Sequence, residues 1–558
     1  MRDSRRLTGP NILGERPGPV IDIAIQDQQA EIALAAWKSA AESLLEAVGW
    51  GSESTVARRF PGGLSLGFSA PMDALYAACE MNEWAWSVAE AQLDGNTLPS
   101  LEAATAHFQT EIRAESNPLL LRLQVAAQKH GALFLCCDDF VSIGAGRHAE
   151  TWPVKSLPEA GEIDWDQRER IPIAMITGTN GKTTTVRLLR SMVKAQGKVA
   201  GMSSTDWLMV GDEIIDKGDW AGPGGARTIL RDNRVDVALL ETARGGMLRR
   251  GLGIGAGEAD VVLLTNIAED HLGEWGIQDL AMLADTKFVI RHAGRCIVLN
   301  ADNQQSVERQ HLVHTPITWF SLDAQNLVVK EHLAQGGCAA LLDTNSLWWC
   351  ENHERQRLLA VDEIPITLNG AARHNTANAL AAIAVAKGLG LDHESILNGL
   401  RSFRSDATDN PGRLNIFDIN GVKILVDFAH NPHGLDALMT MAKAMQPKRL
   451  LVTLGHAGDR QDDALCEVAL TAWRHRPDRV ILKEQERDLR GRSLGEVPQI
   501  MKSALLAAGA PESAIDYAAD EIEAAKQALA WAKPGDLLLL LTLSHREEVL
   551  RLLTKLST

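Results

Sequence analysis

The sequence predicts an α/β protein with a central parallel sheet, a smaller α/β domain after it and an α+β domain before it. Three observations support this class. Short, uniformly apolar segments alternate with helical segments from Ile173 onward, which is typical of a parallel sheet covered on both faces. The same rhythm restarts after Pro411. The residues before the first of these segments instead show mostly helical periodicity.

Residues 1–165 form the first predicted domain. A short apolar segment, VIDIAI, favours a strand, and candidate helices rich in Ala, Leu, Glu and Trp follow over residues 28–48, 71–93 and 101–130. The proline-rich, charged stretch TWPVKSLPEAGEIDWDQRERIP is typical of an exit linker. In the second helix, core or interface positions are expected for Tyr76, Trp84 and Trp86.

Residues 166–410 and 411–558 form the second and third predicted domains. The strand candidates of the second are IAMITG, VDVALLET, ADVVLLTN and CIVLNAD. Those of the third are KILVDFAH, RLLVTLGH, RVILKE and DLLLLLTL. Sheets of this kind collect ligands at the carboxyl ends of their strands, so functional residues are expected there.

The composition excludes several classes of function. The chain carries 56 Lys and Arg against 72 Asp and Glu, a formal net charge of −16, which argues against nucleic-acid binding. The seven cysteines follow no metal-ligand or disulfide spacing, which indicates reduced thiols. The N-terminus lacks a signal-peptide core, and no later apolar run is long enough to span a membrane. We therefore expect a cytoplasmic protein with no membrane contact.

A glycine-rich loop between the strand IAMIT and a helix predicts a phosphate site. Its main-chain N–H groups and the helix N-terminus attract anions, Lys182 adds a cation, and the Thr183 hydroxyl can bind Mg²⁺. Ile176 stands where the usual phosphate-loop motif has its first glycine, and the bland alternative is an ordinary strand-to-helix turn. The context favours a nucleotide-binding loop made of Gly178, Thr179, Asn180, Gly181, Lys182, Thr183 and Thr184.

Two further strand ends carry polar residues. ETARGG places Glu241 where a carboxylate can serve a second metal, and Arg244 where it can contact substrate or phosphate. TNIAEDHLG places Asp270 and His271 at the next strand end, and Lys287 follows. Each group alone could be a solvated loop or a satisfied pair. Because the carboxyl ends of parallel strands share one edge, together they predict one Mg-nucleotide site.

These motifs resemble the Mur ligase superfamily of ATP-dependent amide-forming enzymes. The resemblance spans about residues 170–558 and is carried, in order, by GTNGKTTT, ETARGG, TNIAEDHLG, GAARHNTANALAA, PGRL and VDFAHNPHGL. Within it, ETARGGMLRRGL, Gly458-Asp459-Arg460 and DLRGRSLGE are most similar to the Mur-like half of cyanophycin synthetases. The resemblance implies a Mur-ligase-like central ATPase domain, a Rossmann-like C-terminal domain, and ATP with two Mg²⁺ sites as cofactors.

The resemblance also implies roles for individual residues. Lys182, Glu241, His271 and Lys287 would be catalytic, with Thr183, Glu241 and His271 as metal ligands and Lys287 at the position of a carbamylated lysine in many relatives. Nucleotide contacts would come from the loop together with Asn378, Arg413 and Asp427. Substrate contacts are implied for Arg244, His430, Asn431, Arg490 and Arg492.

The chain departs from full cyanophycin synthetases in its first part. Those enzymes carry an ATP-grasp domain before the Mur-like half, and too few residues precede Ile173 here for one. Relatives with a zinc-binding H-x-x-E-H helix differ as well, because the helix over residues 71–93 contains no histidine. Asn303 in Asn-Ala-Asp-Asn and Trp207 after Asp206 also depart from the family pattern. We therefore expect one amide condensation per acceptor, without processive elongation by two amino acids.

The substrates expected from this resemblance are a small carboxylate acceptor, such as an aspartyl-containing one, and an amino acid or amine. A homo-oligomer is expected, with a dimer as its simplest form. Two alternatives stay open. The chain could be a catalytically idle nucleotide-binding partner of another ligase, although the intact Lys182, Glu241 and His271 disfavour this. It could also be an amino-acid ligase of the folate or cell-wall type.

Overall fold

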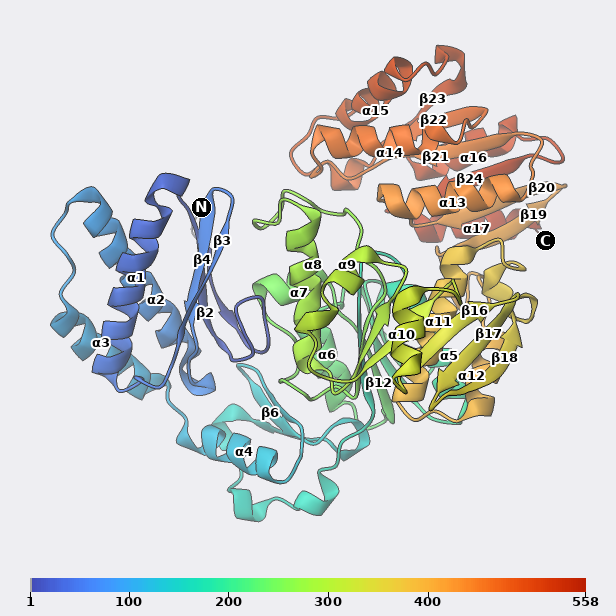
Figure 1. The fold of residues 1–558 in the computed structure, drawn as a ribbon. Coiled ribbons are helices and arrows are strands. Elements are labelled where there is room, and N and C mark those ends of the chain that lie inside the picture. Colours follow the sequence, from blue (N-terminus) through green and yellow to red (C-terminus); the bar gives the residue numbers. More distant parts are fainter. Residues whose placement is uncertain (1–2, 558) are drawn as a thin grey trace.

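The N-terminal part of the chain is a four-stranded antiparallel sheet with three helices packed on it. The computed structural model describes residues 3–557, and Figure 1 shows this part beside the central part of the molecule. The sheet order is β1-β2-β4-β3, and the Trp37 indole N–H donates to Asn82 Oδ1 (2.9 Å) inside its core. The elements are β1 (Asp3–Leu7), β2 (Gly18–Ala24), α1 (Asp27–Val48), β3 (Thr55–Phe60), β4 (Gly63–Phe68), α2 (Leu75–Asp94) and α3 (Leu101–Glu115).

The predicted helix over residues 101–130 is wrong as a single element. The chain forms α3 and then α4 (Pro118–Lys129), separated by Ser116 and Asn117. Pro118 cannot continue a preceding helix but suits the first turn of the next one, and Asn117 Oδ1 accepts from the Leu120 N–H (3.2 Å) as its cap. The predicted linker also carries structure, since a small antiparallel sheet follows α4, composed of β5 (Phe134–Cys136), β6 (Phe140–Ile143) and β7 (Glu150–Pro153).

The central part is built on one sheet of 11 strands in the order β11-β10-β9-β12-β8-β13-β14-β15-β16-β17-β18. The strands from β9 to β16 are parallel, and the outer strands pair antiparallel at both edges. The four predicted strands are confirmed as β8 (Ile173–Thr177), β12 (Val237–Glu241), β13 (Val261–Leu264) and β14 (Ile297–Asn300). The others are β9 (Ala200–Ser203), β10 (Trp207–Val210), β11 (Glu213–Lys217), β15 (Ile317–Ser321), β16 (Cys338–Asp343), β17 (Ser346–Glu351) and β18 (Glu354–Ala360).

Helices cover both faces of this sheet, as its uniformly apolar strands predict. Ile173 and Met175 of β8 belong to one core, whereas Ala174 and Ile176 belong to the core on the other face. The second of these cores includes side chains of α5, α11 and α12. The helices of this part are α5 (Lys182–Ala195), α6 (Pro223–Arg231), α7 (Arg244–Arg249), α8 (Leu280–Phe288), α9 (Gln304–Glu308), α10 (Leu327–Ala334), α11 (Arg373–Gly388) and α12 (His393–Ser402).

The C-terminal part is a second α/β unit on a six-stranded sheet of order β19-β20-β24-β21-β22-β23, parallel except at β19. The four strands predicted here are confirmed as β20, β21, β22 and β24. Its elements are β19 (Asn415–Ile419), β20 (Val422–Asp427), α13 (Pro432–Ala444), β21 (Leu450–Leu454), α14 (Asp462–Arg474), β22 (Arg479–Lys483), α15 (Glu496–Ala507), β23 (Ile515–Ala518), α16 (Glu521–Trp531), β24 (Leu537–Leu541) and α17 (Arg546–Ser557).

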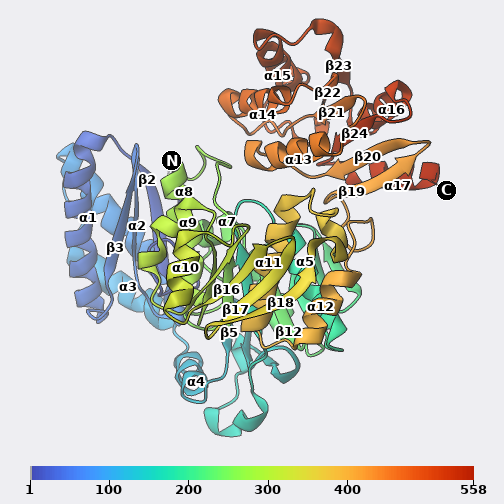
Figure 2. The same cartoon turned by 45° about the vertical axis from the view of Figure 1, so that its right-hand side comes forward.

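Figures 1 and 2, which view the molecule from two directions, both show the C-terminal part above the central part. A cavity of about 1100 Å³ is lined by residues of both parts, from Thr179 in the first strand-to-helix loop to Ser544 after β24. Both sheets therefore contribute the carboxyl ends of their strands to one cavity. Within residues 3–557, every helix is too short or too polar to span a bilayer.

Candidate functional site

The predicted phosphate loop has the geometry that its glycines require. Gly178 and Gly181 adopt φ values of 144° and 86°, and a Cβ at either position would lie within 2.2 Å of a neighbouring side-chain oxygen. The Lys182 ammonium donates to the carbonyls of Gly178 (3.1 Å) and Thr179 (3.0 Å). Lys287, from α8, donates to the same Gly178 carbonyl (2.8 Å). Two cations thus lie against one turn of main chain.

Burial favours the neutral form of the Lys287 amine. Lys287 has only 4% of its surface exposed. Burial lowers its pKa to about 7, and the nearby Lys182 charge adds to the effect. At neutral pH a large share of Lys287 is therefore a neutral amine, which is the form that can react or accept a proton.

Oxygen ligands suitable for Mg²⁺ meet beside the loop. The Thr183 hydroxyl donates to Glu241 Oε2 (2.9 Å), and the Thr205 hydroxyl donates to Oε1 of the same carboxylate (3.2 Å). Glu241 ends β12 and is 2% exposed. Hydroxyl and carboxylate oxygens are the ligands that a hard cation such as Mg²⁺ prefers. Thr183, predicted to bind the Mg²⁺ of the nucleotide, and Glu241, predicted to serve a second metal, thus lie in direct contact.

His271 belongs to a different cluster. Its potential ligand atoms lie within 4.8 Å of those of Asp270 and His430, a grouping that could hold a metal ion and does not include Glu241. The His271 backbone has a φ of 54°, so the loop after β13 turns sharply here. A metal shared between Glu241 and His271 stays a prediction.

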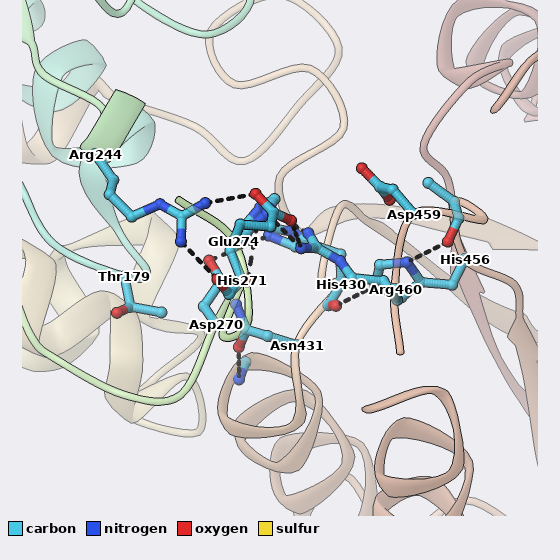
Figure 3. Close-up of polar contacts among 12 residues, drawn as sticks. Thr179, Arg244, Asp270, His271, Glu274, His430, Asn431, His456, Asp459 and Arg460 are labelled. Carbon is cyan, nitrogen blue, oxygen red and sulfur yellow. Dashed lines mark hydrogen bonds and ion pairs between the residues drawn. The ribbon is translucent and has the colours of Figure 1, made fainter. Parts of the chain in front are cut away.

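Arg460 reaches this cluster from the C-terminal part, as Figure 3 shows. Its Nη2 donates to His271 Nε2 (2.6 Å) and its Nη1 donates to Glu274 Oε1 (2.9 Å). His271 Nδ1 is 2.9 Å from Glu274 Oε1 and can donate to it. Both ring nitrogens are therefore engaged by protein groups.

Arg244 holds the same loop from the other side. It donates to the His271 carbonyl (2.6 Å) and to Glu274 Oε2 (2.6 Å), and its guanidinium carbon lies 4.8 Å from the centre of the Trp275 ring. The loop also touches the N-terminal part, because the Gln278 side chain donates to the Pro61 carbonyl (3.2 Å). Residues from three parts of the molecule thus fix one loop, which we call the acceptor loop (residues 269–278).

The charges in this cluster shift the pKa values of its members. Burial opposes ionisation of Glu274, but the hydrogen bond to His271 and the charges of His271, Arg244 and Arg460 outweigh it and lower its pKa to about 2. Burial likewise opposes ionisation of Asp270, yet His430, His271 and Arg460 hold its pKa far below the usual range. Burial lowers the pKa of His271, which favours its neutral form. The carboxylates therefore stay charged at any physiological pH.

The residues predicted to contact the nucleotide line the same cavity, with the exception of Gly178. Asn378 lies against Gly181 and donates to Asn375 Oδ1 (3.1 Å). Asp427, at the end of β20, accepts main-chain N–H bonds from Leu414 (2.7 Å) and Ala429 (2.8 Å). Its pKa is raised, chiefly by burial. The Asn180 and Asn431 amides exchange hydrogen bonds of 3.2 and 3.0 Å across the two parts.

Arg413 is held by a group of charges that the sequence did not predict. It lies 3.8 Å from Asp206, which also accepts from Arg187 (2.6 Å) and, across the junction, from Arg546 (2.8 Å). Burial opposes ionisation of Asp206, but the three guanidinium groups outweigh it and lower its pKa to about 2. The Arg413 guanidinium also lies 4.3 Å from the Phe428 ring centre. Asp206 therefore orients the arginine that lines the cavity.

The two arginines of DLRGRSLGE have different positions. Arg490 lines the cavity and pairs there with Asp459. Arg492 does not line it. It pairs with Asp462 (2.7 Å) and Glu496 (2.8 Å) and donates to the Arg460 carbonyl (2.6 Å), so it supports the turn that carries Arg460. A direct substrate contact by Arg492 stays a prediction.

Sequence reasoning missed Arg460, Glu274 and Asp206 as site residues. Arg460 and Asp206 stand in segments that the sequence analysis names, and Glu274 directly follows TNIAEDHLG. Arg460 and Glu274 are separated by 186 residues, however, and nothing local in either segment indicates the pairing. The aromatic residues of α2 differ in their burial. Trp86 is 4% exposed and belongs to the N-terminal core, whereas Tyr76 is 53% exposed. The expected stripe of aromatic residues on α2 is therefore divided between the core and the surface.

Known proteins match the central and C-terminal parts of the chain. The family model of the Mur ligase middle domain matches residues 176–386, and that of the Mur ligase glutamate ligase domain matches residues 412–542. Cyanophycin synthetase of Geminocystis herdmanii is 39% identical over 374 residues, which cover 66% of this chain and 42% of that protein. Cyanophycin synthetase of a Synechocystis species is 39% identical over 363 residues, 64% of this chain and 41% of that protein. The chain thus spans less than half the length of these relatives.

Solved structures support the fold. Bifunctional folylpolyglutamate synthase/dihydrofolate synthase from Yersinia pestis, complexed with AMPPNP and Mn ion, matches with a TM-score of 0.51 at 18% identity and covers 69% of this chain and 89% of that one. E. coli FolC in complex with DHPP and ADP matches with a TM-score of 0.50 at 19% identity and covers 69% of this chain and 88% of that one. At such low identity these matches concern the fold alone.

Proposed function

This chain belongs to the Mur ligase family, and on that premise we propose that it is an ATP-dependent ligase that joins a carboxylate to an amine. One observation carries the proposal. The phosphate loop with Lys182, the Thr183–Glu241 pair and the charged acceptor loop all line one cavity between two α/β units. A nucleotide, an acceptor and an amine can therefore meet there.

We propose ATP and a divalent metal as the cofactors, with Mg²⁺ as the physiological ion. The oxygen donors of Thr183 and Glu241 fit such an ion, which would neutralise phosphate charge during transfer. A second ion is proposed at Asp270, His271 and His430, where Arg460 would have to withdraw from His271. Lys287 is proposed to support metal binding, in a carbamylated form.

The reaction we propose has two steps. An acceptor carboxylate oxygen attacks the γ-phosphorus of ATP, the bond from that phosphorus to the bridging oxygen breaks, and ADP leaves. The amine nitrogen then attacks the carbonyl carbon of the acyl phosphate, phosphate leaves, and the amine gives up a proton to solvent or a nearby base. Lys182 belongs to the loop that is proposed to bind the phosphates, and its ammonium can stabilise the charge that develops during the transfer.

The acceptor side is proposed to lie between Arg244 and the acceptor loop, and the amine side near His430, Asn431 and Arg490. The Arg244 guanidinium on the acceptor side suits an acceptor with a second carboxylate, such as an aspartyl-containing one. Because water would hydrolyse an acyl phosphate, the contacts from Arg460 and Asn431 across the cavity are proposed to hold the two units closed during the reaction. The domain limits 1–165, 166–410 and 411–558, and a dimeric assembly, belong to the same proposal.

A direct assay tests this function. The purified chain is given ATP, Mg²⁺, β-aspartyl-arginine or aspartyl peptides and a panel of amines, and released phosphate and product masses are measured. We expect phosphate release that requires both acceptor and amine, and a product heavier by a single condensation. Growth by alternating aspartate and arginine would contradict the single condensation. Nucleotide binding without acceptor-dependent turnover would instead support the idle-partner alternative.

A further inference from the structure

A second cavity, of about 650 Å³, lies where the N-terminal part meets the central part. It is lined by the segment from Thr8 to Pro17, by the region of α4 and β5 and by the glycine-rich segment 253–258, and it shares no lining residue with the nucleotide cavity. Figure 1 shows α4 at the bottom of the molecule, away from the C-terminal part at the top. Its volume falls in the range of small-molecule sites.

Two arginines that line this cavity have no carboxylate partner among residues 3–557. The Arg227 side chain donates one hydrogen bond, to the Thr8 hydroxyl (2.7 Å), and its Nε is buried without a partner. The Arg170 side chain donates to the Glu258 main-chain carbonyl, and its Nε is likewise buried without a partner. A partly buried guanidinium with no carboxylate in direct contact is costly, so both arginines suit an anion supplied from outside.

The carboxylates of the same cavity are already engaged. Glu53 pairs with Arg16 (2.8 Å), Glu15 with His292 (2.7 Å), and Glu258 accepts from the Gly255 N–H (2.5 Å). Of the arginines that line the cavity, Arg16 pairs with Glu53 and Arg295 with Asp260, whereas Arg227 and Arg170 form no ion pair with a described residue. Apolar lining is supplied by Pro10, Pro17, Ala70, Pro71, Met72, Leu121 and Ile254.

We propose that this cavity binds a small organic dicarboxylate, with one carboxylate group at Arg227, the other at Arg170 and the carbon skeleton against the apolar lining. Guanidinium groups bind carboxylates through paired N–H donors, which gives the site its preference. Because the lining comes from both parts of the chain, an occupant would connect the N-terminal part to the central part. The site does not depend on the proposed ligase function.

Calorimetric titration of the full chain with succinate tests this proposal, with succinamide as the uncharged probe and ionic strength held constant. We expect saturable binding of succinate at millimolar concentration and none of succinamide. Arg227→Gln and Arg170→Gln should each raise the Kd at least about tenfold. Arg16→Gln, a matched change at a cavity arginine that has a carboxylate partner, should change it less than twofold.

Further variants distinguish this site from the nucleotide cavity and from misfolding. Arg244→Gln, at the acceptor loop, should leave succinate binding unchanged, and Arg227→Gln should retain ADP binding in the nucleotide cavity. Arg227→Lys, which keeps the charge but not the paired donors, should weaken binding less than Arg227→Gln. Succinate binding that is lost with Arg244→Gln and kept with Arg227→Gln would overturn the proposal. Absence of saturable binding, or equal binding of inorganic phosphate, would overturn it as well.

Discussion

The two ends of the nucleotide cavity are held in different ways. At the phosphate loop, main-chain carbonyls and two glycines with positive φ fix the positions of Lys182 and Lys287. At the acceptor loop, the fixing contacts are side chains that come from elsewhere in the chain, such as Arg460 and Arg244. The first end is therefore formed by local sequence, whereas the second depends on how three parts of the molecule pack.

This difference has a consequence for function. Phosphate groups are the same in every nucleoside triphosphate, so a rigid local loop suffices to bind them. Acceptors and amines vary between ligases, and a loop held by distant side chains can change its specificity when any of the three parts changes. We expect substitutions at the first end to abolish turnover and substitutions at the second to change the use of substrates.

The largest effect is expected for Lys182→Ala. Loss of the only cation within the phosphate loop should reduce acceptor-dependent ADP formation by at least about 10²–10³-fold, because charge on the transferred phosphoryl group would lose its partner. Steady-state kinetics measure this, and a thermal melt checks the fold. Lys198→Ala, at an exposed position after α5, is the matched control and should be neutral. Turnover within a few-fold of the parent would show that the loop is not catalytic.

The next effect is expected for Glu241→Gln. The amide can still accept from Thr183 but has lost the charge that holds a cation, so the half-saturating Mg²⁺ concentration should rise about tenfold to hundredfold. Titration of activity with Mg²⁺ measures the shift. Glu213→Gln, on the exposed edge strand β11, serves as the control. An unchanged Mg²⁺ requirement would place the metal elsewhere.

A smaller and more selective effect is expected for Arg460→Gln. Removing its bonds to His271 and Glu274 should raise the KM for the amine about tenfold, because the C-terminal part loses a charged contact with the acceptor loop. The Kd for ADP should change less than twofold. Arg474→Gln removes a surface pair with Glu467 and is the control. Equal losses in ADP and amine affinity would contradict the division between the two ends.

The smallest effect is a pH dependence of stability that originates at Lys287. Its folded pKa of about 7 lies below the ordinary 10.5, so between these values the unfolded chain binds more protons than the folded one. The free energy of unfolding of the parent should therefore rise with pH across this window relative to Lys287→Met. Urea denaturation at several pH values measures the difference. A difference that does not change with pH would mean that Lys287 is charged when buried.

The sequence predicted the elements that depend on neighbouring residues. Apolar runs such as IAMIT and VALLE gave β8 and β12, and the glycines of GTNGKTT required the turn that the structure shows. Strands such as β17 and β18 were not predicted, because they pair at an edge through a hairpin and lack the uniformly apolar pattern of the buried strands. The break between α3 and α4 was marked by Pro118, whose position at the start of a helix was overlooked.

Site residues could likewise be predicted where their contact lies within one sheet, and could not be predicted where the contact joins two separate units. Thr183 and Glu241 were predicted together and do meet, because the ends of adjacent parallel strands necessarily share an edge. The contact of Arg460 with His271 could not be predicted, since it depends on the relative placement of two α/β units joined by a short connection. Asp206 was noted only as a neighbour of Trp207, whereas it is the shared partner of Arg187 and Arg546.

The hairpin between β3 and β4 gives the N-terminal part a direct influence on the acceptor loop. A side chain at Gly276 would lie 2.9 Å from the Phe60 ring, and Gln278 donates to Pro61, so the hairpin packs closely against the loop that carries His271. Anyone who trims the chain to its two ligase-like units would remove this support and leave the loop facing water. We expect a shortened enzyme to keep its nucleotide chemistry and to lose discrimination among acceptors. The hairpin is therefore a suitable place to graft loops from relatives when new substrates are sought.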